Sequence, residues 1–554
     1  MSFKHLFTSL ASLAIGLAIA LVAAEPPEAP PTPGQIVVAA ATDLYSVREI
    51  VVDGMKVGTP VIDPETAKTV RYIWLDSPAE VRASEKKVMD GHLNLLSRKT
   101  GIRTAVQVAP WLYRIDLNDY GEQFTKAWEK LAATDWVFHE EDFTGEVEYK
   151  EVEVEYGYWQ RADGTKRAGG SQKFPDEKWV TTRKEKERKP VASKTAGFAK
   201  WVVDTEQAKT QLQNLLGKQG QNNVPVLQWS QLFYETALQE DRKVGYYGML
   251  GLKDLKDYER LIGVARRDID PERLAELREA VANSTITIED TLRRIVVLQA
   301  VGGHYFLTQD SNQAKLAKDD KDRGNPLFEH GDDYVFQAIE AFGNLNNGLP
   351  ATVLSNDKGV LQNKAPDFIA GRDSTAPGSD DAVHVNLSCI RCHNKAGMQD
   401  VHGWVRNVLN LPPNALNGRT PEEKKKLAGF YVERRLEPAI KAFRERVDIA
   451  CMEATGWKFE QFSAAYGKAW ARVSQAVSFE QACLELGTTQ AAYKTSLVKM
   501  REAKTLHPNL AGHALDKPVA IPRIQFIQAY PFAQDGLRGK ARPFKVKVKE
   551  SVEK

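Results

Sequence analysis

The feature that most constrains this chain is the short run Cys389-Ile390-Arg391-Cys392-His393. Two cysteines three positions apart lie on the same face of a helical turn, and the next residue is rotated by about 100° around the helix axis. This C-x-x-C-H arrangement is the attachment pattern of a c-type haem. It predicts a helical turn that carries Cys389 and Cys392 as thioether anchors and His393 as the proximal iron ligand of one covalent haem c.

Three other interpretations of the motif stay open. A structural zinc site would need further ligands, and the nearest one, His402, does not give the usual spaced pairs. A thiol-redox pair normally follows a strand of a βαβ unit, which the surrounding sequence does not indicate. The third alternative is a plain disulfide between Cys389 and Cys392.

The other two cysteines, Cys451 and Cys483, are 32 residues apart, each in a helical stretch. We expect either a disulfide that joins two neighbouring helices or two buried thiols. Neither cysteine belongs to a second C-x-x-C-H motif, so we expect one haem per chain.

The distal iron ligand decides whether the haem has both axial positions filled or one open. Met398 and His402 follow His393 too closely to reach the opposite face of the ring easily. The main candidates are therefore Met452 and Met500, and an open or water-bound site is the alternative. The remaining candidates are all histidines, namely His304, His330, His384, His507 and His513.

The composition is that of an ordinary globular protein. Of 554 residues, 42% are hydrophobic and 27% are charged, and 75 Lys and Arg against 73 Asp and Glu leave a formal net charge of +2. These values exclude a disordered or fibrous chain, and nothing in the bulk charge attracts nucleic acid. At about 150 residues per domain, the length allows three or four domains, or two large ones.

The N-terminus has the pattern of an export signal. Lys4 and His5 precede an apolar run that ends at Ala24, so we expect a cleaved signal peptide over residues 1–24, with an uncleaved membrane anchor as the alternative. Five prolines between Glu25 and Gly34 indicate an extended linker, placed at residues 25–44. The mature protein is then expected in the periplasm or secreted, with no further transmembrane segment.

The order of elements predicts a mainly α protein with some β structure, in the α+β class. A mixed α+β half over residues 45–345 contains a strand at 109–117 and an inserted β-hairpin with a charged segment at 143–196. A helical, cytochrome c-like haem region over 346–539 and a basic tail over 540–554 follow.

Several local signals refine this outline. Alternation around 146–156 slips at Lys150-Glu151, which suggests a bulge. Caps at Asp270 and Thr287 open helices, the second ending at Gly302-Gly303, and residues 349–361 indicate a hairpin. Later in the chain, Thr420 opens a helical stretch that Pro438 is expected to kink, and Ser478 and Gly487 bound another helix.

Four stretches resemble the large c-type cytochrome-domain proteins exported by planctomycetes and some proteobacteria. They are residues 94–98, 112–121, 340–349 and 387–393. Asn346 stands where that family usually has proline, and the insertion at 143–196 is peculiar to this chain. The resemblance implies a secreted monohaem cytochrome with Cys389 and Cys392 as anchors and His393 as proximal ligand.

One-electron transfer in the cell envelope, with a redox partner protein, is the function we expect from these signals. The alternatives are a haem-dependent peroxidase or oxidase, which needs an open iron position, and a haem-based sensor or binding module. The sequence leaves open whether the protein is an enzyme.

Overall fold

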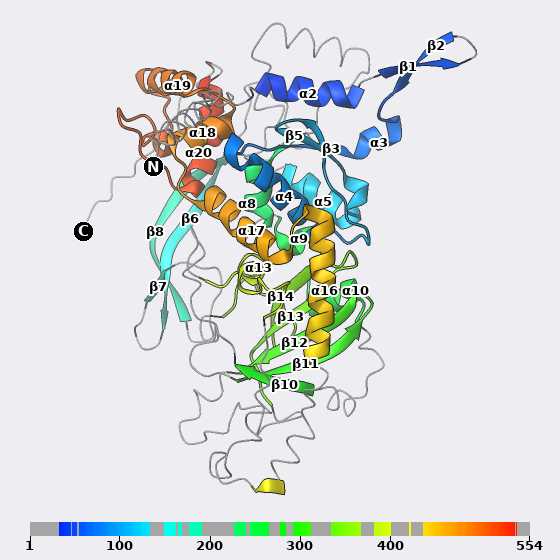
Figure 1. Cartoon of the computed structure of the whole chain (residues 1–554). Coiled ribbons are helices and arrows are strands. Elements are labelled where there is room, and N and C mark those ends of the chain that lie inside the picture. The colour runs from blue at the N-terminus through cyan, green and yellow to red at the C-terminus, as the bar shows by residue number, and fades with distance from the viewer. Residues whose placement is uncertain are drawn as a thin grey trace, which may run out of the picture.

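The computed structural model confirms the α+β class (Figure 1). It describes residues 31, 33–45, 47–52, 55–132, 149–161, 164, 166–168, 177–190, 226–239, 244–264, 278–283, 292–311, 334–366, 382–399, 420–422, 436–537 and 539. The expected signal peptide, the basic tail, the helix start at Asp270 and the candidate ligands His330 and His402 lie outside these residues.

A four-stranded sheet lies in the N-terminal part, in the order β4-β5-β3-β9. Its strands are β3 (Val70–Trp74), β4 (Val106–Ala109), β5 (Leu112–Asp116) and β9 (Val226–Gln228), and only β3 and β9 run parallel. The strand expected at 109–117 is therefore confirmed in part, because Pro110 and Trp111 form the turn between β4 and β5. Around the sheet lie α3 (Pro64–Thr69), α4 (Ala79–Leu95), η1 (Leu117–Asp119), α5 (Glu122–Ala132), α8 (Trp229–Thr236) and α9 (Tyr246–Leu250).

More than half of the expected linker is a helix. Helix α2 (Pro33–Tyr45) begins with Pro33, whose fixed φ suits the first turn. Ile36, Ala40 and Leu44 recur every four residues and are buried, and Asp43 accepts hydrogen bonds from Tyr72 of β3 at 2.8 Å. The linker prediction for 25–44 is wrong over residues 33–44, because this apolar stripe packs against the sheet. A small hairpin, β1 (Val47–Val52) and β2 (Met55–Pro60), follows α2.

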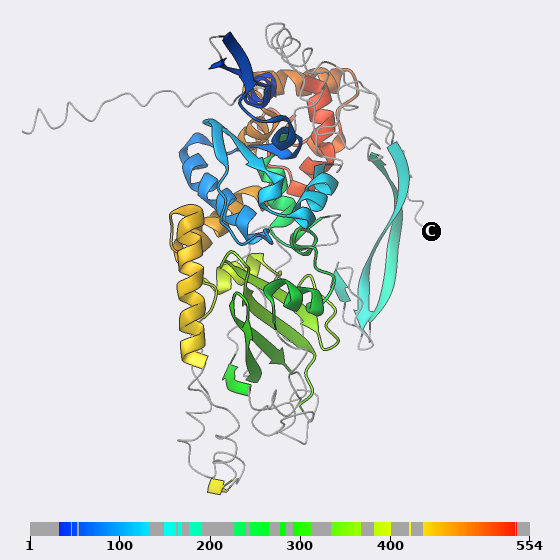
Figure 2. The same cartoon turned by 90° about the vertical axis from the view of Figure 1, so that its right-hand side faces the viewer.

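The inserted hairpin is confirmed. Strands β6 (Tyr149–Arg161) and β8 (Glu177–Pro190) pair antiparallel, and β7 (Lys166–Ala168) pairs with β6. They form a long ribbon at one side of the molecule (Figure 2). The bulge lies between Tyr156 and Gly157 instead of at Lys150-Glu151. The mixed-charge run of β8 faces acidic positions of β6, with Glu153 opposite Lys186, and opposite charges at direct cross-strand positions stabilise pairing.

A five-stranded antiparallel sheet has the order β10-β11-β12-β13-β14. Its strands are β10 (Arg278–Asn283), β11 (Leu292–Ala300), β12 (Gly303–Asp310), β13 (Ala338–Asn344) and β14 (Pro350–Asn356). The helix expected from Thr287 to Gly302-Gly303 is wrong, since residues 292–300 form β11 and Val301-Gly302 is the hairpin turn to β12. The branched run Ile295-Val296-Val297 favours a strand, and pairing on both edges of β11 outweighs the capping signal.

The domain boundary expected at residue 345 divides a hairpin. Strands β13 and β14 pair across the turn at Leu345, whose N–H donates to Leu349 O at 2.8 Å. The hairpin expected at 349–361 is confirmed only at its tip, where Asn356 N–H donates to Val360 O, because β14 pairs mainly with β13. One hydrophobic core therefore joins the two predicted halves.

Helices dominate the C-terminal part, as expected. They are α13 (Leu387–Cys392), α16 (Leu436–Thr455), α17 (Phe459–Ser474), α18 (Phe479–Leu486), α19 (Gln490–Glu502), η5 (Pro508–Leu510) and α20 (Arg523–Leu537). Helix α10 (Leu255–Ile262) comes earlier in the chain, before the five-stranded sheet. Ser478 and Gly487 bound α18 as predicted. Pro438 lies in the first turn of α16 and does not kink its interior.

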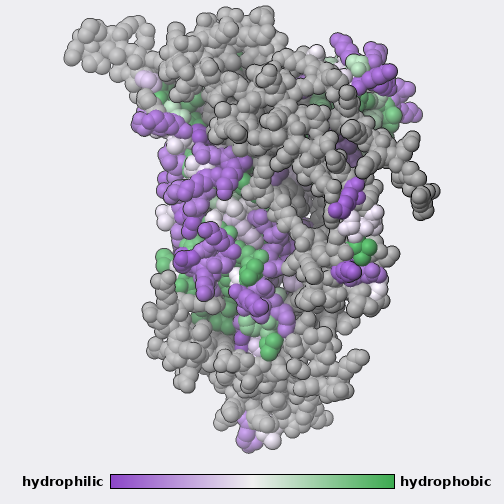
Figure 3. Space-filling view, turned by 180° about the vertical axis from the view of Figure 1, so that it is seen from behind, coloured by the Kyte–Doolittle hydropathy of each residue, from purple (hydrophilic) through white to green (hydrophobic). Residues whose placement is uncertain are grey.

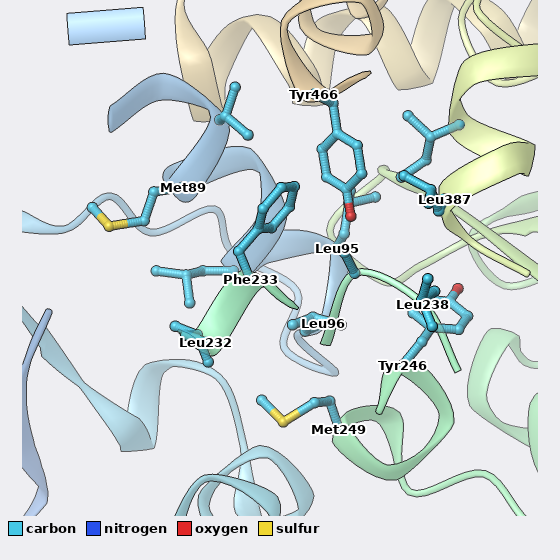
Figure 4. Close-up of a cluster of buried hydrophobic side chains, with 14 of the residues drawn as sticks. Met89, Leu95, Leu96, Leu232, Phe233, Leu238, Tyr246, Met249, Leu387 and Tyr466 are labelled. Carbon is cyan, nitrogen blue, oxygen red and sulfur yellow. The ribbon is translucent and has the colours of Figure 1, made fainter. Parts of the chain in front are cut away.

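Helices α4, α8, α9, α13 and α17 meet in a buried hydrophobic cluster that includes Phe233, Leu387 and Tyr466 (Figure 4). This cluster fixes α13 against the N-terminal part. The described surface in Figure 3 mixes hydrophilic and hydrophobic side chains. In the part of the chain that the structure describes, no helix is both long and apolar enough to cross a bilayer.

Candidate functional site

The C-x-x-C-H motif forms the predicted helical turn. Cys389 and Cys392 lie on α13, and His393 caps its C-terminus, donating its backbone N–H to Cys389 O at 2.8 Å. Asn386 precedes the helix with φ 63°, a conformation that non-glycine residues adopt mainly when side-chain contacts hold them there. Cys389 is buried, whereas Cys392 is partly exposed.

Helix α17 and the segment after α8 hold this turn in place. The Asn386 amide donates to Ala237 O at 2.6 Å and to the Tyr466 hydroxyl at 3.2 Å. Ser463 of α17 donates to Ile390 O at 2.9 Å. These bonds to buried polar groups explain how so short a helix keeps a defined position.

One face of the five-stranded sheet contacts the motif. Glu340 and Phe342 alternate on β13 and so share a face. Cys389 Sγ lies 3.8 Å from Glu340 Oε1, and His393 Nε2 lies 3.7 Å from the same oxygen. The ring centroids of Phe342 and His393 are 4.4 Å apart. The structure thus brings together a thiol, an imidazole and a carboxylate beside an aromatic ring.

Two further charged side chains surround Glu340. Arg293 of β11 lies 3.2 Å from Glu340 Oε2 and makes a bidentate pair, at 2.8 Å for each contact, with Asp310 of β12. Burial alone would raise the pKa of Glu340. The nearby His393 and Arg293 lower it by more than burial raises it, so this pKa lies below its ordinary value. Glu340 is therefore ionised at neutral pH.

The pKa of the Cys389 thiol bears on the thiol-redox interpretation of the motif. Burial, followed by the charge of Glu340, raises the pKa of its thiol well above the ordinary value. A reactive redox cysteine needs the opposite shift, because the thiolate is the nucleophile. None of the four cysteines is in a disulfide, so a Cys389–Cys392 disulfide is not formed.

The expected disulfide between Cys451 and Cys483 is not formed either. Cys451 is buried on α16 with its sulfur 3.7 Å from Thr455 Oγ1, and Cys483 is buried on α18. Burial raises the pKa of each thiol to about 12. The second expectation, two buried thiols, describes the structure.

The distal candidates are dispersed. Met452 is 45% exposed on α16, and Met500 is buried on α19 with its sulfur 3.9 Å from Ser496 Oγ. Both ring nitrogens of His513 are engaged, with the Tyr493 hydroxyl at 3.2 Å and Val477 O at 2.9 Å.

The remaining described histidines differ in their surroundings. His507 accepts a hydrogen bond from Asn509 N–H, and His384 is buried just before α13. His304 of β12 lies on the sheet face that carries Phe306, because side chains two residues apart on a strand share a face. Phe306 is opposite Phe342 in the register, so His304 shares the face that contacts His393.

A haem needs two free thiols, a histidine with an available ring nitrogen, and apolar surroundings. Cys389 and Cys392 are not in a disulfide, and His393 Nδ1 is buried without a hydrogen-bond partner among the described residues. Phe342 supplies an apolar neighbour. These residues fit the group. In the described ranges, no group of three or more His, Cys, Asp or Glu side chains is arranged so that it could hold a bare metal ion.

The sequence analysis missed Glu340, Arg293 and Asp310. Their meeting depends on the register of three strands, and one of these strands was expected to be a helix. The available signal was a lone carboxylate inside the apolar run 338–342. A charge in a buried strand calls for a partner.

Three of the four stretches that carry the family resemblance meet in space. The Asn347 amide donates to Asn94 O at 2.8 Å, the Asn346 amide donates to Arg98 O at 3.3 Å, and Arg98 N–H donates to Tyr120 O at 3.2 Å. No protein-family model, curated protein or solved structure matches the chain. Membership of the cytochrome family thus stays a prediction.

Proposed function

We propose that the protein is an exported monohaem c-type cytochrome that transfers single electrons in the cell envelope. The observation that carries the proposal is the turn of α13, on which two cysteines that form no disulfide lie together with His393 against a buried sheet face. The spacing of these three side chains is that of haem attachment.

The roles of the residues follow from their chemistry. Cys389 and Cys392 would hold the group through two thioether bonds, and His393 would supply a ring nitrogen to the iron. The bound haem supplies a one-electron couple between Fe(II) and Fe(III). Phe342, whose ring centroid lies 4.4 Å from that of His393, would limit the access of water there, and lower access of water strengthens the effect of nearby charges on that couple.

Export and a redox partner belong to the same proposal. Covalent attachment of haem takes place outside the cytoplasm, which agrees with the signal-like segment at residues 1–24. We therefore expect the protein in the periplasm or secreted, where a partner protein would deliver or remove the electron.

The test is expression with a signal peptide and a c-type haem maturation system. Wild-type protein should retain haem after acid-acetone extraction and on a denaturing gel, whereas Cys389→Ser/Cys392→Ser protein should lose it. The matched control is Cys451→Ser/Cys483→Ser, which also removes two thiols and should retain haem. Wild-type polypeptide without covalent haem would refute the proposal.

The same preparation separates electron transfer from the alternatives. Reduced protein whose α and β absorption bands do not move with carbon monoxide has both axial positions filled, as an electron carrier requires. A spectrum that shifts with carbon monoxide indicates an open iron position and would favour the peroxidase, oxidase or sensor alternatives.

A further inference from the structure

The contact between α13 and β13 is closed beside the motif. Cys389 Sγ lies 3.8 Å from Glu340 Oε1, and His393 Nε2 lies 3.7 Å from the same oxygen. Cys389 is only 3% exposed. A planar molecule needs about 3.5 Å to the atoms on each of its faces. Any group that reaches the Cys389 thiol in the folded protein therefore requires α13 and β13 to separate.

Two strained backbone positions enclose the motif. Asn386, just before α13, has φ 63° and ψ −65°, and Leu387 N–H donates to Val385 O at 2.8 Å. These values describe the classic γ-turn, which is rare and strained. Ala396, beyond the motif, has φ 52°, a conformation in which Cβ crowds the following carbonyl oxygen. Residues 387–395 thus lie between two positions whose backbone favours another conformation.

The chain is fixed just outside these two positions. The Asn386 side chain donates to Ala237 O at 2.6 Å and to the Tyr466 hydroxyl at 3.2 Å. Beyond the second position, Arg444 of α16 donates twice to Met398 O, at 3.0 and 2.7 Å. Because both ends are fixed, movement of the segment between them leaves the rest of the fold in place, as in local unfolding.

We infer that the segment between Asn386 and Ala396 opens away from β13 as one unit in the folded protein and exposes the Cys389 thiol. Leu387 and Ile390 are buried in the closed form, Leu387 in the cluster of Figure 4, so the open form is a minor population. Release of strain at the two positions offsets part of this cost. The inference does not depend on the proposed function, although haem placed between α13 and β13 would require the same movement.

Thiol labelling of the full chain, made without haem, tests this opening. Cys392→Ser in every sample removes the partly exposed neighbouring thiol. With iodoacetamide and mass spectrometry, we expect Cys389 to react about tenfold faster than Cys451 and Cys483, which are just as buried but lie inside α16 and α18. Rates in unfolded protein correct for intrinsic reactivity. Low urea concentrations should accelerate the two control thiols much more than Cys389, because local opening exposes little surface.

Two glycine variants separate local opening from global unfolding. Ala396→Gly removes the Cβ strain from the closed form, so labelling of Cys389 should slow by about threefold. Lys504→Gly is the matched control, since Lys504 also has a positive φ, 57°, but follows α19 outside the segment. It should slow labelling of Cys451 and Cys483 and leave that of Cys389 unchanged.

Two results would overturn the inference. One is equal labelling rates at Cys389, Cys451 and Cys483, and the other is an equal effect of the two glycine variants on Cys389. Either would show that the thiol is exposed only by global unfolding. The proposed function fails by a different result, the absence of covalent haem from the wild-type chain, which leaves these labelling rates unaffected.

Discussion

His92 Nδ1 lies 3.0 Å from the hydroxyl of Tyr466, a residue 374 positions further along the chain. Both side chains are fully buried. His92 Nε2 lies 2.7 Å from Thr236 Oγ1, whose own proton goes to Leu232 O. His92 must therefore donate from Nε2 and accept the Tyr466 proton at Nδ1. Burial lowers the pKa of His92 to about 3, so it is neutral at pH 7.

This bond connects α4 to α17 next to the C-x-x-C-H motif, because the Tyr466 hydroxyl also accepts a hydrogen bond from the Asn386 amide, just before α13. Tyr466→Phe would leave two buried groups, His92 Nδ1 and one Asn386 N–H, without that partner. We expect the free energy of unfolding to fall by about 1–3 kcal/mol in urea titrations. Tyr113→Phe is the control, since its hydroxyl makes only a 3.4 Å contact to Pro110 O. Equal losses in the two variants would contradict this account.

Asp76 predicts a specific pH dependence. It follows β3, and its carboxylate accepts from Ser230 N–H at 2.9 Å and from the Gln228 amide at 2.8 Å. Burial, opposed by Arg472 and assisted by Glu485, raises its pKa to about 6. In the unfolded chain this pKa is about 3.9. The stabilising contribution of Asp76 is thus complete below about pH 4 and is lost as the pH rises through about 6.

The measurement is the free energy of unfolding of wild-type and Asp76→Asn protein between about pH 4 and 7. The difference, wild type minus variant, should decrease with rising pH by on the order of 1–3 kcal/mol, because Asn does not ionise. Subtracting the free energy of unfolding of the variant removes the contributions of the other carboxylates. A difference that is constant or increases with pH would show that Asp76 is already ionised in the folded protein.

Arg523 and Glu485 form a buried bidentate ion pair at 2.6 and 2.8 Å. Their side chains are 3% and 0% exposed. Arg523→Met should cost about 3–5 kcal/mol, because it leaves a buried carboxylate without its counter-charge. Replacement of both partners by apolar residues should cost less than the sum of the single changes.

An exposed pair gives the control for this experiment. Lys68 lies 2.7 Å from Glu65, and their side chains are 64% and 81% exposed. Lys68→Met should change the free energy of unfolding by at most about 1 kcal/mol. If Lys68→Met and Arg523→Met lowered the free energy of unfolding by similar amounts, burial would not determine how much an ion pair stabilises this protein.

Cys451 and Cys483 should behave as two unreactive thiols. Because burial raises the pKa of each to about 12, an alkylating reagent at neutral pH should modify neither in native protein and both after unfolding, without a reductant. Mass spectrometry of the two peptides measures this directly. Disulfide-linked peptides from non-reduced protein would show instead that Cys451 and Cys483 form a disulfide.

The α+β class, the hairpin at 143–196 and the α18 helix were predictable because their signals are local. Alternating side chains around 146–156 indicate the hairpin, and Ser478 and Gly487 supply both ends of α18. The helical turn of the C-x-x-C-H motif belongs to the same group, since spacing alone places both cysteines on one face.

The predictions for residues 292–300 and 33–44 were wrong for the same reason: contacts with residues distant in the sequence decide the structure of both segments. Residues 292–300 have a helix cap before them, yet they become β11 because β10 and β12 pair with both of their edges. Residues 33–44 were assigned to a linker, yet they fold as α2 because the sheet of β3, β4 and β5 offers an apolar surface. Tertiary pairing outweighs weak local preference in both cases.

The sequence by itself determined the local chemistry of this protein: two thiols and an imidazole on one helical turn, at a spacing set by 3.6 residues per turn. Only the tertiary structure decided what surrounds that turn. Glu340 reaches Cys389 and His393 because β13 pairs with β12 and presents alternate residues to α13. Strand register is decided by burial of whole sheet faces, which no short stretch of sequence contains.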